Sequence, residues 1–163
     1  MLVIQLCKVA LVASVAFFFT LIAYGNIADY GSNWAFVQHV LSMDTTSPDS
    51  TLHWRAITTP TIQTVGYWMI IAAETLTAIL LWAGVVRLLG RVGAPGFTDA
   101  KPLAVVGLVL GFLIFAVGFV AVGGEWFAMW QSQIWNGQTK AFEFLSMISA
   151  VLIILLLPER WER

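Results

Sequence analysis

The stretch Pro60–Leu89, PTIQTVGYWMIIAAETLTAILLWAGVVRLL, decides the fold of this chain. From Val65 to Leu89 the residues are almost all apolar, and at about 1.5 Å of rise per residue a helix of this length crosses a bilayer. Glu74 lies well inside the run, where an ionisable side chain costs several kcal/mol unless it is paired, protonated or hydrated. The stretch therefore predicts an integral membrane protein with a polar group built into its interior.

The composition of the 163 residues agrees with a membrane protein. Hydrophobic residues make up 60% of the chain and charged residues only 10%, against roughly 25% charged residues in soluble domains. The net charge of −1 argues against a nucleic-acid partner, which requires a basic face. The single cysteine, Cys7, excludes an intrachain disulfide and is expected to be a small buried hydrophobe.

Three further apolar segments complete the predicted fold, an all-α, four-helix membrane bundle that forms one domain over residues 1–163. Lys8, near one end of the first span, is expected to snorkel to the lipid headgroups. The glycine pair Gly123–Gly124 is expected to break or bend the third helix. The predicted spans are about 2–24, 61–89, 103–122 and 140–157, with external loops at 25–60 and 123–139.

The first loop is long enough to require internal structure. We expect Ser32 to cap an amphipathic helix over 33–43, which lies on the membrane surface or folds over the bundle. A second short amphipathic piece is expected over 53–57. Thr59 and Thr139 are expected to cap the second and fourth spans. The apolar face of the first amphipathic helix comprises Phe36, Val37, Val40 and Leu41.

Basic residues are unevenly divided between the two sides of the predicted bundle. Only Arg55 and Lys140 lie on the side of the first and third loops. The positive-inside rule therefore predicts cytoplasmic termini in a bacterial inner membrane, with those two loops outside and able to pack into a cap. The basic residues on the side of the termini are Lys8, Arg87, Arg91, Lys101, Arg160 and Arg163.

Glu74 has three possible roles on sequence grounds. As a neutral acid it bonds a neighbouring hydroxyl, with Tyr67 and Thr77 on the same helix face. As a carboxylate it pairs with a basic group from another element, such as Arg55 or Lys140. In the third role it belongs to a proton or ion path. A purely structural bond is the preferred interpretation.

Small residues in the third span predict close helix packing. Gly107 and Gly111 form a GxxxG pair, and Gly118 extends the small-residue surface. Such surfaces allow helix backbones to approach in lipid, where no hydrophobic force drives association. The sequence leaves open whether the partner helix belongs to the same chain or to another subunit.

Polar and aromatic residues at the external ends of the spans form a candidate pocket. They are expected to line a site for a quinone or a lipid headgroup, or to form a buried ionic network under the cap. An interfacial tryptophan belt is the simpler interpretation of the aromatic residues. The candidate residues are Asp29, Asn33, His39, Trp54, Arg55, Glu125, Trp126, Trp130, Lys140 and Glu143.

Metal binding receives only weak support. His39 and Met43 are four residues apart on a predicted helix, and imidazole with thioether suits copper. The alternative is that His39 bonds loop backbone while Met43 fills a packing gap. The sequence predicts no cofactor other than a bound lipid or quinone.

The stretch His39–Thr46, HVLSMDTT, is followed by Trp54-Arg55-Ala56-Ile57 and then by the span that carries Glu74. In these features the chain resembles a bacterial family described as predicted small integral membrane proteins, a domain of unknown function. The resemblance covers nearly the whole chain. It implies four spans and a bacterial inner-membrane location, and it brings no activity or functional residue.

The sequence shows no nucleophile–base pair, phosphate loop or intramembrane histidine pair, so we expect a protein without enzymatic activity. The preferred hypothesis is a structural or interaction subunit that self-associates through its third span or joins a larger membrane complex, with membrane lipids around it. The alternatives are a lipid- or quinone-binding protein with a tryptophan-rich external pocket, and an ion or proton conductor centred on Glu74.

Overall fold

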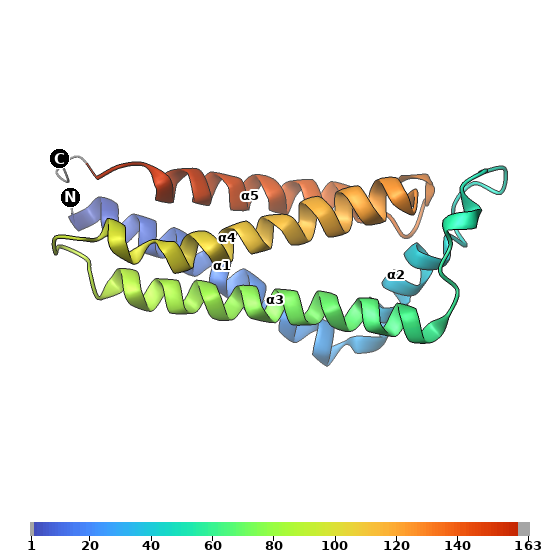
Figure 1. Ribbon diagram of the computed structural model, residues 1–163, viewed down its shortest axis with the longest axis horizontal. Coiled ribbons are helices and arrows are strands. Elements are labelled where there is room, and N and C mark those ends of the chain that lie inside the picture. Colours follow the sequence, from blue (N-terminus) through green and yellow to red (C-terminus); the bar gives the residue numbers. More distant parts are fainter. Residues whose placement is uncertain (1, 160–163) are drawn as a thin grey trace.

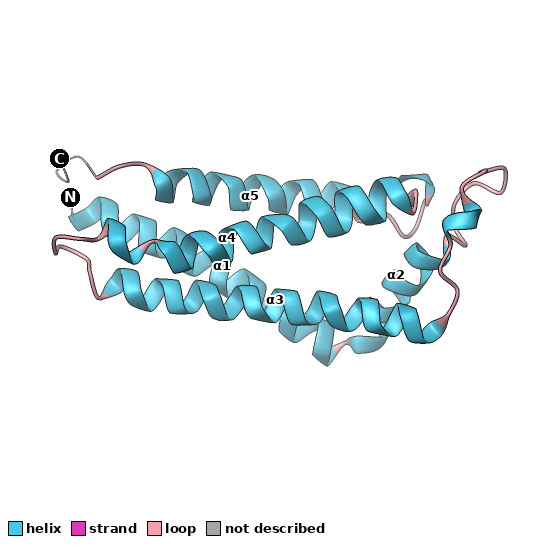
Figure 2. Ribbon diagram, in the orientation of Figure 1, coloured by secondary structure: helices cyan, strands magenta, loops and turns pink. Residues whose placement is uncertain are grey.

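The computed structural model describes residues 2–159, which form an all-helical bundle (Figures 1 and 2). Its long helices are α1 (Leu2–Ala28), α3 (Pro60–Leu89), α4 (Pro102–Leu113) continued by η3 (Ile114–Trp126), and α5 (Gln138–Leu156). Within the described residues, four helices are long and apolar enough to cross a membrane. The prediction of an all-α protein with four spans is confirmed, and the observed spans differ from the predicted ones by a few residues.

Glycines bring the third span into backbone contact with its neighbours. A Cβ atom on Gly84 of α3 would lie 2.7 Å from the backbone nitrogen of Ala104 in α4. On α4, Gly107 packs against Leu81 and Gly111 packs against Phe19. The GxxxG pair therefore contacts helices of its own chain. The fully buried residues around these contacts include Val12, Val15, Ala16, Phe19, Leu81, Ala104, Leu108 and Ile148.

The first loop folds back on the bundle as helix α2 (Tyr30–Ser42). This helix begins at Tyr30 with Asp29 at its N-cap position, so the predicted cap at Ser32 is wrong. The Tyr30 and Tyr67 rings pack edge to face at 4.9 Å between centroids. Helix α2 thus packs against α3 (Figure 1). A 3₁₀ turn, η1 (His53–Arg55), follows it.

Two of the predicted helix caps are absent. Thr59 occupies the N-cap position of α3, but its side chain makes no capping hydrogen bond. Helix α5 begins at Gln138, one residue before Thr139, and Gly137 lies at its N-cap position. Proline at the start of α3 is well suited to the first helical turn, where no backbone N–H is required.

The first and third loops contact each other at the end of the bundle that carries α2, which we call the loop end. The Thr45 and Ser132 hydroxyl oxygens are 2.8 Å apart, and the Ser47 backbone N–H donates to the side-chain oxygen of Gln131 at 3.1 Å. A 3₁₀ turn, η4 (Met129–Gln131), lies in the third loop. Beneath these contacts is a buried cluster of Val40, Met43, Phe127, Ala128 and Met129.

The second half of the third span is a π-helix, η3, and the expected break at Gly123–Gly124 is wrong. The helix runs through both glycines, and the Phe127 N–H donates to the Val122 carbonyl, five residues earlier, at 3.0 Å. Gly124 packs against the Gln138 side chain at the start of α5, where a Cβ atom would collide. The glycines thus permit close packing of α5 on a continuous helix.

The other end of the bundle, where α1 begins and α5 ends, is called the terminal end (Figure 1). The connection between α3 and α4 lies there and contains a 3₁₀ turn, η2 (Thr98–Ala100). Lys8 is 4% exposed and paired with Glu159, so the prediction that it snorkels to the headgroups is wrong. Cys7 is exposed on α1, contrary to the expected burial. Adjacent residues of an α-helix point about 100° apart. Because Lys8 points into the bundle, its neighbour Cys7 points to the outer surface.

A candidate apolar cavity and two polar clusters

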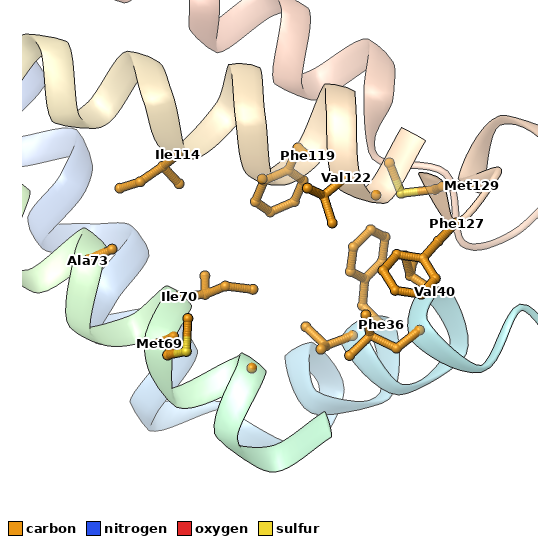
Figure 3. Close-up of a pocket in the computed structure, with 15 residues that line it drawn as sticks. Phe36, Val40, Met69, Ile70, Ala73, Ile114, Phe119, Val122, Phe127 and Met129 are labelled. Atoms are coloured by element: carbon orange, nitrogen blue, oxygen red, sulfur yellow. The ribbon is translucent and has the colours of Figure 1, made fainter. Parts of the chain in front are cut away.

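An apolar cavity of about 330 Å³ lies between α2, α3 and η3 at the loop end (Figure 3). Its volume is at the lower end of the range for small-molecule sites, roughly 300–1,000 Å³. Its lining contains no charged residue and no residue with a polar side chain other than methionine sulfur. The lining residues are Phe36, Val37, Val40, Leu41, Gly66, Met69, Ile70, Ala73, Ile114, Gly118, Phe119, Val122, Gly123, Phe127 and Met129.

The π-helix aligns one wall of this cavity. Hydrogen bonds between residues five apart give a π-helix more residues per turn than an α-helix, so residues four or five apart share a face. Ile114, Gly118, Val122 and Phe127 all line the cavity at such spacings. In an α-helix, at about 100° per residue, Ile114 and Phe127 would point about 140° apart. The π-helical backbone therefore brings Phe127 to the wall that Ile114, Gly118 and Val122 form.

The cavity opens on the outer surface of the bundle between α3 and η3. Met69 on α3 is 65% exposed and Val122 on η3 is 42% exposed, and both line the cavity. In Figure 3 they project from opposite walls. Gly118 has no neighbouring atom within 4 Å of the position that a Cβ would occupy. Its missing side chain thus leaves part of the space empty.

Glu74 belongs to a separate polar cluster between α1 and α3. The Asn26 side-chain amide donates a hydrogen bond of 2.6 Å to the Glu74 carboxylate. The Tyr67 hydroxyl donates to the Asn26 backbone carbonyl at 2.9 Å, and the Thr77 hydroxyl donates to the Ala73 carbonyl at 2.8 Å. All three predicted intramembrane residues are buried. The bond that Glu74 makes is to an asparagine that sequence reasoning did not consider.

The ten residues of the predicted external pocket are not assembled into one site, and none lines the apolar cavity. The Arg55 guanidinium lies 4.6 Å from the ring centroid of Trp126 and 5.4 Å from that of Trp54. Lys140 and Glu143 form an exposed ion pair at 2.7 Å.

Other members of that predicted pocket lie apart on the outer surface. Asp29, Glu125 and Trp130 are exposed. The Asn33 side-chain amide donates to the Asp29 backbone carbonyl at 3.2 Å, a bond within one helical turn. The bond between Asn33 and Asp29 is therefore local and joins no second element.

His39 and Met43, the weak metal candidates, have different surroundings. The His39 ring stacks on Trp135 at 4.6 Å between centroids, and its Nδ1 lies 2.8 Å from the Asp44 carboxylate. Met43 is 1% exposed and packs in the cluster of Val40 and Phe127. Within residues 2–159, no three His, Cys, Asp or Glu side chains converge as metal ligands.

The terminal end contains a buried ionic cluster that sequence reasoning missed. Lys8 Nζ donates to a Glu159 carboxylate oxygen at 2.6 Å, and Lys101 Nζ lies 3.2 Å from the same oxygen. Both ammonium groups also donate to the Leu157 carbonyl, at 2.7 Å and 3.3 Å. Burial raises the pKa of the Glu159 carboxyl, but the hydrogen bonds from Lys8 and Lys101 outweigh it, and the pKa is below its usual range. The cluster joins α1, the η2 loop and the segment after α5.

This fold defines an integral membrane protein with four apolar helices and two buried polar clusters. The chain belongs to the family described as "Predicted small integral membrane protein (DUF2165)", whose pattern matches residues 4–158. The resemblance inferred from the first loop and the Glu74 span is thereby confirmed. Comparisons with curated proteins and with solved structures gave no match.

Proposed function

We propose that this protein binds a lipid hydrocarbon chain in the apolar cavity between α2, α3 and η3. The observation that supports it is the continuous apolar lining of a space of about 330 Å³ that opens between exposed apolar side chains. Water gains few hydrogen bonds in such a space, whereas the chain of a neighbouring lipid makes dispersion contacts along the walls.

The chemistry of the cavity favours a hydrocarbon chain over a quinone. A quinone ring carries carbonyl groups that require hydrogen-bond donors, and the lining side chains offer none. The rings of Phe36, Phe119 and Phe127 provide wide apolar surfaces for a flexible chain.

The two other functions that the sequence suggested receive less support from the geometry. Association of copies through the third span would use Gly107 and Gly111, and both are packed against helices of the same chain. A conducting role would require Glu74 to lie on a hydrated path. Its carboxylate instead accepts a hydrogen bond from Asn26, and it does not line the apolar cavity. If the protein is a subunit of a larger complex, the contact with its partner would use an outer surface other than Gly107 and Gly111, since these two glycines already pack within the chain.

Filling the cavity tests the proposal. The Gly118→Leu side chain would enter the empty space beside Phe119. Phospholipid with a photoreactive group in its acyl chain is expected to cross-link wild-type protein at Met69 and Phe119, with the sites mapped by mass spectrometry. In Gly118→Leu, cross-linking there should fall at least about fivefold, equivalent to about 1 kcal/mol of lost packing.

Gly25→Leu provides the matched control, because Gly25 on α1 also has open surroundings but lies outside the cavity. It should cross-link as the wild type does. Equal cross-linking of Gly118→Leu and wild type would contradict the proposal. So would cross-links spread evenly over the outer surfaces of all four spans.

We further propose that the protein lies in a bacterial inner membrane with the terminal end toward the cytoplasm. Lys8, Arg87, Arg91 and Lys101 belong to that end, which supports the orientation by the positive-inside rule. Arg160 and Arg163 lie outside the described residues.

Cysteine labelling tests this orientation in a Cys7→Ser background. Asp49 in the first loop and Asp99 in the η2 loop are both exposed, at opposite ends of the bundle. A membrane-impermeant maleimide added to intact spheroplasts should label Asp49→Cys and leave Asp99→Cys unlabelled until the cells are lysed. The reverse pattern would place the terminal end outside.

A further inference from the structure

A second cavity adjoins the ionic cluster at the terminal end. Its volume is about 590 Å³, and it is lined by Thr98, Lys101, Pro102, Val105, Val106, Leu156, Pro158 and Glu159. Its polar residues belong to the η2 loop and to the segment after α5. Its apolar residues belong to the first turns of α4, to the last turn of α5 and, at Pro158, to the segment after α5. The cavity therefore has both polar and apolar walls.

Among residues 2–159, the ionic cluster beside this cavity has an excess of positive charge. Lys101 and Glu159 line the cavity, and Lys8 lies behind them on α1. Lys8 and Lys101 contribute two positive charges and Glu159 one negative charge, so this cluster of described residues has one positive charge in excess. Both lysines are buried, at 4% and 5% exposure. The nearby acid Asp99 is exposed. Burial lowers the pKa of the Lys101 ammonium, and repulsion from Lys8 adds to the effect while Glu159 opposes it. A second anion would relieve this repulsion.

The start of α4 reinforces the preference for an anion. Lys101 lies at the N-cap position of α4, which continues as η3 across the span. The first backbone N–H groups of a helix lack intrahelical partners, and the helix dipole places partial positive charge there. The helix dipole thus adds partial positive charge close to Lys101, while Pro102 in the first turn has no N–H to donate.

The apolar part of the cavity leads to the outer surface of the bundle. Val106 is 53% exposed and Leu156 is 57% exposed, as expected of side chains that face lipid in a spanning helix. A phosphate held near Lys101 would therefore have a lipid-facing apolar wall directly beside it. A free phosphate ion would gain nothing from that wall.

We propose that this cavity binds an anionic phospholipid, with its phosphate beside Lys101 and an acyl chain along Val105, Val106 and Leu156. The site differs from the apolar cavity at the loop end, so either one can fail without the other. The Gly118→Leu variant should leave anionic-lipid binding at the terminal end unchanged.

Removal of one charge tests the site. Full-length protein in detergent is titrated with phosphatidylglycerol or with phosphatidylcholine of the same chains, and bound lipid is measured by native mass spectrometry. The wild type should prefer phosphatidylglycerol. Lys101→Gln should bind phosphatidylglycerol about fivefold more weakly, as expected for one lysine at an anionic lipid surface. This variant keeps the Lys8–Glu159 pair, and Lys101→Arg should retain the preference.

Two further variants separate the site from general surface charge. Arg91→Gln removes an exposed charge from the same end and should leave the preference unchanged. Glu159→Gln removes the competing carboxylate and should strengthen phosphatidylglycerol binding. The proposal is overturned if Lys101→Gln binds as the wild type does, if Arg91→Gln loses as much affinity, or if Glu159→Gln binds more weakly. It is also overturned if inorganic phosphate alone competes as effectively as the lipid does.

Discussion

The Asn26→Leu variant is expected to lose about 3 kcal/mol of unfolding free energy, because it leaves the buried Glu74 carboxylate without its hydrogen-bond donor. Removing one partner of a buried hydrogen bond leaves the other partner unsatisfied, which costs about 1–3 kcal/mol. The Tyr67 hydroxyl donates to the backbone carbonyl of residue 26 at 2.9 Å, which remains in the variant, and only its longer contact of 3.4 Å with Asn26 Oδ1 is lost. The loss should therefore report mainly on Glu74. Thermal unfolding in detergent, followed by circular dichroism, measures it.

A double-variant cycle distinguishes this bond from general packing. Replacing both partners by leucine removes the unsatisfied group, so Asn26→Leu/Glu74→Leu should recover most of the lost stability. Glu74→Gln keeps a side-chain oxygen that accepts from Asn26 and should cost only about 1 kcal/mol. If Asn26→Leu unfolds at the same temperature as the wild type, then Glu74 is hydrated from another direction, and its proposed role as a structural hydrogen-bond partner of Asn26 is wrong.

The Gly84→Ala variant is expected to separate α3 from α4. The added methyl group would lie 2.7–2.8 Å from the backbone nitrogen, the Cα and the Cβ of Ala104. Overpacking typically costs about 1–3 kcal/mol, and the upper end applies because backbone atoms cannot rotate away. For a chain of this size, a loss of about 3 kcal/mol lowers the unfolding midpoint by about 6–12 °C.

Gly25→Ala supplies the comparison, since nothing lies within 4 Å of its Cβ position on α1. In a helix interior, alanine is more favourable than glycine by roughly 0.5–1 kcal/mol, so this variant should melt at or slightly above the wild-type temperature. Similar melting of the two alanine variants would show that α3 and α4 are not in backbone contact.

The four spans were predictable because their signal is local. An uninterrupted apolar run of membrane length has few alternative structures, and the second span was placed to within one residue. Helical spacing also predicts an inward face of α3 made of Tyr67, Ile70, Glu74, Thr77 and Leu81. Four of these residues are buried, whereas Ile70 is half-buried and lines the apolar cavity. Prediction was weaker wherever the outcome depends on which helices become neighbours.

The partner of Glu74 is an example of such dependence. Hydroxyl and basic side chains were considered, but Asn26, 48 residues earlier, makes the bond. The sequence signal for this partner was Asn26 itself, an amide side chain near the end of the otherwise apolar helix α1. The ionic cluster had a similar signal in Lys8, Lys101 and Glu159, which all lie at the membrane edges of their segments on the same side.

The cavity could not be predicted because periodicity arguments assume an α-helix. With α-helical spacing, Ile114 and Phe127 do not share a face, and Gly118 and Gly123 are interpreted as packing or breaking residues. The π-helical backbone changes that alignment and places Phe127 along the same wall as Ile114, Gly118 and Val122. Neither Gly123 nor Gly124 ends the helix. Both are buried, Gly123 against Met129 and Gly124 against Gln138.

The pairing of Lys8 with Glu159 also has a consequence for biosynthesis. The two residues are 151 positions apart, so the first span leaves the ribosome long before its counter-charge has been translated. Until then Lys8 has to stay hydrated at the membrane edge, and the first helix cannot settle at its final depth. A nascent chain that stops before Glu159 would therefore lack the counter-charge that both Lys8 and Lys101 have in the finished molecule.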